Sequence, residues 1–134
     1  MGKRKRLSAD ARKEANKTKY FASLRNCPTS PQKMRYVADL VRGMEVFKAL
    51  SVLKFNTRAS STKLEKVLAS AIDNFEKKTG EKPDADTLFV KEIFVDSAFQ
   101  LKRLRTAPQG RAYRIKKRSH HVTVFIDKKT TENN

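Results

Sequence analysis

The residues best suited to binding chemistry are eight basic side chains between positions 97 and 126, a thirty-residue stretch without aspartate or glutamate. Ordinary surface segments mix both signs of charge, because like charges packed together repel one another. Guanidinium and ammonium groups form charge-assisted hydrogen bonds with phosphate oxygens. We therefore expect this segment to lie against a phosphate-rich polyanion. Its cations are Lys102, Arg103, Arg105, Arg111, Arg114, Lys116, Lys117 and Arg118.

The same stretch has the pattern of a β-hairpin. Apolar residues interrupt the charges, and Pro108-Gln109-Gly110 near the middle is typical of a turn. Ten residues leading to that turn would extend roughly 33 Å at ~3.3 Å each. A domain of this length has a radius of gyration near ~14 Å, so the hairpin would protrude from the body. Two isolated strands are marginally stable in water, and the interior of a folded RNA would supply the missing walls.

The charge of the whole chain agrees with a polyanionic partner. Its 134 residues carry a formal charge of +17, which suggests one domain with a modest core. Residues 1–35 carry +9, residues 36–96 are neutral and residues 97–134 carry +8. The excess charge therefore lies on two arms of an ordinary body, a distribution typical of nucleic-acid binding.

Other classes of function lack the residues they require. The basic stretch contains no carboxylate for metal or acid–base chemistry, so we predict no enzyme and no catalytic residue. The adjacent pair His120-His121 has no further ligands to complete a metal site, so we expect no metal and no cofactor. We expect one imidazole to hydrogen-bond RNA and the other to pack, and we place His120 with the RNA-binding residues.

The sequence also indicates where in the cell the protein is located. No run of about eighteen apolar residues is present, and the N-terminus lacks the apolar core of a secretory signal. Cys27 is the single cysteine, so no intramolecular disulfide is possible. We expect a cytoplasmic protein without a membrane partner.

The elements that must hold the basic hairpin can be placed by periodicity. Ser30-Pro31 is a favourable helix start, and apolar residues at helical spacing lead to Gly43. A second helix is expected around residues 46–53 and a third over 64–75, closed by Gly80. Residues 81–87 form a polar connection.

Strand patterns occupy the remaining body. Residues 88–95 and 121–126 are rich in β-branched and aromatic side chains, with Val122, Val124 and Ile126 on one side. An earlier strand is expected over 20–27. The fold class predicted is α+β: three helices packed on a small antiparallel three-stranded sheet, two of whose strands extend into a long protruding basic hairpin.

The two ends of the chain are expected to differ from this domain. Residues 1–19 form a basic extension in which Ser8 could cap a short helix, but no apolar face would stabilise it alone. We expect the extension to become ordered against a partner. Residues 20–127 form the single domain, including the hairpin at 97–120, and residues 128–134 a polar tail.

An ordered set of segments resembles the bacterial ribosomal large-subunit protein twenty-two family. The resemblance covers about residues 20–127, and its specificity rests on the order and spacing of the segments. They are Ser30 to Gly43 (SPQKMRYVADLVRG), Lys66-Val67-Leu68, Ser70-Ala71-Ile72, Ile93-Phe94-Val95-Asp96, Lys102-Arg103, Gly110-Arg111-Ala112, Ile115, Lys117-Arg118 and His121-Val122-Thr123-Val124.

The resemblance implies a structural constituent of the large ribosomal subunit. It implies binding to large-subunit ribosomal RNA (rRNA), help in subunit assembly, contacts with neighbouring ribosomal proteins, and one copy per ribosome. It also implies that the hairpin tip, Thr106, Ala107, Pro108, Gln109 and Gly110, lines the exit tunnel beside the nascent polypeptide. Lys33, Arg35 and Arg42 would contact RNA around the first helix, and the hairpin cations would do so along the arm.

Two departures from the family pattern fall on the hairpin. Many relatives carry Pro-Arg-Ala where this chain has Thr106-Ala107-Pro108, so a tip arginine is missing. Relatives have Gly-Pro where this chain has Ala98-Phe99, which is expected to change the bend at the hairpin base. The alternative function is a nucleoid-type DNA-binding protein, which the charge alone would permit.

Overall fold

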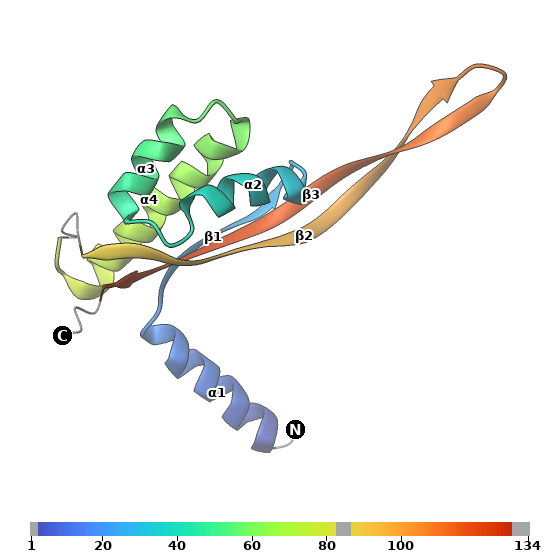
Figure 1. The fold of residues 1–134 in the computed structure, drawn as a ribbon. Helices are drawn as coiled ribbons and strands as arrows, with labels where there is room; N and C mark the ends of the chain where they lie inside the picture. The colour runs from blue at the N-terminus through green and yellow to red at the C-terminus, as the bar shows by residue number, and fades with distance from the viewer. Residues whose placement is uncertain (1–2, 83–86, 130–134) are drawn as a thin grey trace.

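The computed structural model describes residues 3–82 and 87–129 and shows an α+β fold with one long arm (Figure 1). Three strands form an antiparallel sheet in the order β1-β3-β2. The strands are β1 (Tyr20–Cys27), β2 (Leu88–Ala107) and β3 (Arg111–Lys128). The predicted fold class is confirmed, because β2 and β3 run on together beyond the body as the protruding hairpin.

Three helices cover one face of the sheet, as predicted: α2 (Pro31–Val41), α3 (Val46–Phe55) and α4 (Ala59–Thr79). Proline at the start of α2 loses no helical hydrogen bond there, although the Ser30 side chain makes no capping bond. Gly80 ends α4 in the left-handed conformation at φ 72°, which glycine adopts without steric cost. Part of the predicted connection 81–87 lies outside the described residues.

The core lies between the three helices and the sheet. Met34, Leu64 and Leu68 are fully or almost fully buried on the helix side, and Val90 and Val124 face them from the strands. The apolar stripe predicted on α4 is buried from Leu64 to Phe75. Burial of such side chains contributes ~1.5–3 kcal/mol each, so these contacts hold the hairpin base on the body.

Both edges of the sheet are partly covered by the helical layer. Along β2, Gly43 N–H donates to the Val90 carbonyl at 2.9 Å, and Val90 N–H donates to the Met44 carbonyl at 2.8 Å. Along β1, Asn74 Nδ2 donates to the Phe21 carbonyl at 3.0 Å. These bonds satisfy backbone groups that would otherwise offer an edge to another chain.

An additional helix, α1 (Lys3–Lys17), stands apart from the body (Figure 1). It begins five residues before Ser8, the predicted cap, and none of its residues is buried. Its helix-favouring lysine, arginine and alanine residues and the ion pairs Arg6–Asp10 and Glu14–Lys17 account for the conformation. That the extension needs a partner to stay ordered remains a prediction.

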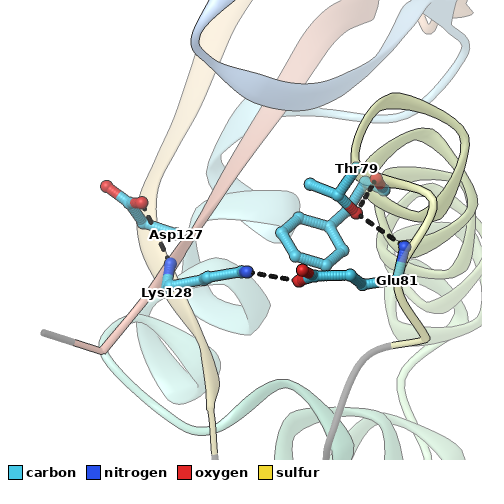
Figure 2. Close-up of polar contacts among 5 residues, drawn as sticks. Thr79, Glu81, Asp127 and Lys128 are labelled. Atoms are coloured by element: carbon cyan, nitrogen blue, oxygen red, sulfur yellow. Dashed lines mark hydrogen bonds and ion pairs between the residues drawn. The ribbon is translucent and has the colours of Figure 1, made fainter.

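The end of the sheet remote from the hairpin is tied to the end of α4 (Figure 2). Lys128 Nζ lies 2.6 Å from Glu81 Oε2 and 5.5 Å from the centre of the Phe75 ring. Lys128 N–H donates to Asp127 Oδ1, and Glu81 N–H donates to the Thr79 hydroxyl. The Lys128 ammonium lowers the pKa of Glu81, first by its hydrogen bond and then by its charge.

Candidate nucleic-acid interface

The hairpin carries its cations on both faces. Residues directly opposite each other in antiparallel strands share a face, so the register assigns every side chain. We call the face that continues the buried side of β3 the helix-side face of the hairpin. The opposite face, which continues the side of the sheet without helices, is called the open face. The helix-side cations are Lys102, Arg114, Lys116 and Arg118, and the open-face cations are Arg103, Arg105, Arg111 and Lys117.

Half of these cations are opposite a large apolar residue. The cross-strand pairs Leu101–Lys117, Arg103–Ile115, Leu104–Arg114 and Arg105–Tyr113 each combine one cation with one apolar side chain. The apolar partner supports the stem of the long basic side chain, while the charged end remains in water. Leu104 and Tyr113 are 73% and 65% exposed, so they are also available to pack on a ligand.

The hairpin cations are unneutralised within the described part of the chain. None of the eight forms an ion pair there, and Lys102 stands directly opposite Lys116. Like charges opposite each other destabilise a strand pair. On the body, by contrast, Lys91, Lys128 and Lys129 each lie within 2.7 Å of a carboxylate oxygen. The arm therefore has a concentrated positive charge that an external polyanion would neutralise.

The tip of the hairpin has no charge from Thr106 to Gly110. The turn follows Pro108, and both Gln109 and Gly110 have positive φ angles, 63° and 68°. Ala107 pairs with Arg111, so the predicted turn lies where the sequence indicated. A short uncharged loop thus ends an otherwise basic arm.

A β-bulge lies at the base of the hairpin, at Ala98 and Phe99. Ser97 pairs with His120 and Gln100 with Arg118, so two residues of β2 stand opposite one residue of β3. A bulge bends the strand and increases its twist. It also changes which β2 residues face the helices, from odd-numbered ones such as Val95 to even-numbered ones such as Lys102. The bulge lies at the departure from the family pattern, and a bend different from that of the relatives remains a prediction.

Two of the predicted RNA contacts, Arg35 on α2 and Arg42 just after its end, have partners inside the protein. Arg35 Nη2 donates to the Val95 carbonyl at 3.1 Å, and Arg42 Nη2 donates to the Ile93 carbonyl at 3.0 Å. Arg42 Nη1 also lies 2.6 Å from Asp39 Oδ1. All three basic residues of the prediction, Lys33 included, remain exposed, so these contacts leave part of each side chain available to RNA.

The two histidines have different environments. His120 is fully buried, and its Nδ1 lies 2.8 Å from the Thr29 carbonyl; because a carbonyl can only accept, Nδ1 carries the proton. His121 is partly exposed, and its Nδ1 accepts the Asn26 N–H at 3.0 Å, which leaves Nε2–H of the neutral ring as a donor. His120 therefore packs, and His121 replaces it as the candidate RNA contact. Because side chains alternate between the two faces of a strand, the pattern that buries Val122 also predicts that His120, two residues earlier, is buried.

Metal binding and membrane insertion lack support in the part of the chain that the structure describes. Within residues 3–82 and 87–129, no three His, Cys, Asp or Glu side chains gather where they could hold a metal ion. No helix in the described ranges is long and apolar enough to cross a membrane.

The comparisons with known proteins agree with one another. The family described as ribosomal protein L22p/L17e matches residues 22–127. A protein of Parabacteroides distasonis named large ribosomal subunit protein uL22 is 61% identical over 127 residues, covering 95% of this chain and 93% of the relative. Relatives of the same name in Porphyromonas gingivalis and Flavobacterium johnsoniae are 58% and 61% identical, covering 100% and 94% of this chain and 100% and 93% of each relative.

Proposed function

Because this chain belongs to the ribosomal protein L22p/L17e family and is a structural constituent of the large ribosomal subunit, we propose that its hairpin threads into folded rRNA. The family is a structural one without enzymatic activity, in agreement with the residue inventory. In this proposal the body lies at the subunit surface, in the cytoplasm, and the arm reaches inward.

One observation carries the proposal: four cations lie on each face of an arm that protrudes from the body. A hairpin that lay flat on RNA would need cations on one face only. Cations on both faces suit a ligand that surrounds the arm, and A-form RNA is bound chiefly through phosphates and 2′-hydroxyls. The opposed pair Lys102–Lys116, unfavourable in the free protein, becomes favourable between phosphates.

The tip of the arm is proposed to line the tunnel of the nascent polypeptide. Thr106, Ala107, Pro108, Gln109 and Gly110 offer no charge to a passing chain, whereas the residues behind them are basic. A charged lining would retain segments of opposite charge. The neutral tip at the end of a phosphate-binding arm supports this division of roles.

The remaining parts have supporting roles in the proposal. Residues 20–127 act as the domain that binds rRNA. Contacts of the hairpin and of the N-terminal extension with separate RNA segments would assist assembly. The basic helix α1, exposed along its length, adds a further RNA contact for the extension 1–19. Neighbouring large-subunit proteins, and a single copy per ribosome, complete the expected surroundings. The tail, residues 128–134, lies mostly outside the described residues.

Sedimentation of cell lysate through a sucrose gradient after a high-salt wash tests the proposal. High salt releases proteins that are held by exposed charge alone, whereas an arm enclosed by folded RNA should remain. We expect the chain to sediment with the large subunit after the wash. Release to the top fractions would contradict threading, and migration with chromosomal DNA would favour the nucleoid alternative.

A further inference from the structure

A groove of about 600 Å³ lies on the body between strand β1 and helix α4, and its Cys27 end lies beside the base of the hairpin. Its walls are mainly apolar, and Ala22, Leu24 and Val67 contribute to them. Three cations, Arg25, Lys63 and Lys66, line it as well, and none of its lining residues is acidic. The groove therefore combines an apolar interior with a positive rim.

The edge of β1 is left open beside this groove. Nearer the start of β1, α4 covers the edge: Asn74 Nδ2 donates to the Phe21 carbonyl, and Lys78 Nζ donates to the Lys19 carbonyl at 2.6 Å. Alternate residues of a strand direct their N–H and C=O groups to the same side, so Ser23 is the next to face outward. Ser23 is exposed, and there α4 presents Ser70 to the groove.

These features together describe a particular ligand. Apolar walls suit a flat ring, the open backbone edge offers one donor and one acceptor, and the cations suit phosphate. A free phosphate would gain nothing from the walls, and a peptide strand would not need three cations. The volume is within the usual range for sites that hold small organic groups. A nucleotide has all three complementary parts.

We propose that the β1–α4 groove holds one unpaired nucleotide of rRNA, with its base between the walls and its phosphates at Arg25, Lys63 and Lys66. Ser23 and the Ser70 hydroxyl would bind the base edge. Proteins recognise RNA sequence mainly at such unstacked bases in loops and bulges. The inference rests on the proposed function, because it assumes rRNA as the partner, but it assigns the body a contact that is independent of the hairpin.

The test compares base accessibility in large subunits purified from cells that carry variants of the full chain. Lys63→Gln with Lys66→Gln removes charge, and Ser70→Phe fills the groove without a charge change. Lys48→Gln with Lys54→Gln, on α3, is the matched control for lost charge. Dimethyl sulfate reports adenines and cytosines, and a carbodiimide reports uridines and guanines.

We expect one short rRNA site to become about tenfold more reactive in both groove variants and unchanged in the control, which corresponds to ~1.4 kcal/mol of lost base binding. Thermal melting of the free variants checks that each one folds. Zero-length ultraviolet cross-linking of wild-type subunits should attach a nucleotide to a peptide of β1 or α4.

Three results would overturn the inference. Unchanged reactivity in groove variants that fold and enter the subunit would mean that the groove holds no base. Cross-links from β1 and α4 to a neighbouring protein would mean that a peptide occupies it. A reactivity change shared with the control would reflect charge alone. Absence of the wild-type chain from the large subunit would instead refute the proposed function itself.

Discussion

Nη2 of Arg42 donates a hydrogen bond to the carbonyl oxygen of Ile93 at 3.0 Å, which joins helix α2 to the outer edge of strand β2. Arg35 makes the equivalent bond to Val95, two residues further along the strand. Both carbonyls face away from β3, where an unpaired edge would otherwise invite another chain. Basic residues on α2 and at its C-terminal end therefore stabilise the sheet from which the hairpin extends, whatever RNA contacts they also make.

Replacing Arg42 with alanine should destabilise the free protein. The variant loses a charge-assisted bond to a backbone carbonyl and the ion pair with Asp39, whereas Lys33→Ala loses no side-chain hydrogen bond or ion pair with another described residue. Because the Arg42 side chain is half exposed, we expect a loss of about 1 kcal/mol in the free energy of unfolding. Urea unfolding at low salt measures it. Equal stability of the two variants would assign Arg42 to RNA binding alone.

Affinity for large-subunit rRNA should fall steeply with salt and depend equally on both hairpin faces. With six to ten phosphate contacts, ~10³–10⁵ in affinity should be lost between 50 and 200 mM salt. Arg103→Ala with Arg111→Ala on the open face, and Lys116→Ala with Arg118→Ala on the helix-side face, should each flatten the slope by about two contacts. Filter binding across salt concentrations measures the slopes. If only one pair matters, the hairpin lies on a surface rather than inside RNA.

Amide hydrogen exchange in the free protein should separate the body from the arm. Residues 64–75 belong to a helix with a buried face, whereas residues 101–106 are exposed on both faces of the hairpin. Regions with few buried apolar contacts open at little cost in free energy. We expect slow exchange in the helix and fast exchange across residues 101–113, read by mass spectrometry. Similar protection in both would show that the arm is rigid without RNA.

Deleting Ala98 should straighten the hairpin base while the body remains folded. The deletion removes the extra residue of the bulge and leaves the pairing of Gln100 with Arg118 possible. The loss of local bend and twist would redirect the arm relative to the body. We expect near-normal thermal melting but poor incorporation into large subunits, compared with Ala98→Gly, which keeps the bulge. Normal incorporation of the deletion variant would mean that the direction of the arm is not set here.

The ion pair between Glu81 and Lys128 should make the folded protein less stable as the pH falls. The pKa of Glu81 is lowered in the folded protein. The stabilisation that the ion pair contributes is therefore fully present above the pKa that Glu81 has in the unfolded chain. It is lost as pH falls through the lower folded pKa. Between pH 5 and pH 3, Glu81→Gln should therefore lose less stability than the wild type, as followed by thermal melting. A parallel decline in both proteins would assign acid sensitivity to other groups, such as Glu45, whose pKa Lys129 lowers.

The elements of the body were largely predictable, because each has a local signal. Period-3.6 apolar spacing located α2, α3 and α4, and the left-handed conformation at Gly80 closes α4 as the glycine indicated. β-Branched and aromatic content located the body parts of β2 and β3, the strand expected over 20–27 is β1, and Pro108-Gln109-Gly110 located the turn. Helix α1 was not predicted over its full length, because it has no apolar face to reveal it.

The sequence by itself determined the long basic arm and its polyanionic partner, since charge and periodicity are properties of neighbouring residues. Only the tertiary structure decided which basic side chains have partners within the protein, as Arg42 does with Ile93. It also decided that Arg25 and Lys63, distant in sequence, line one groove. The physical reason is that periodicity reports the face a residue occupies on its own element. The contact on that face depends on which other elements pack against it, and buried apolar surface distributed over the whole chain determines that packing.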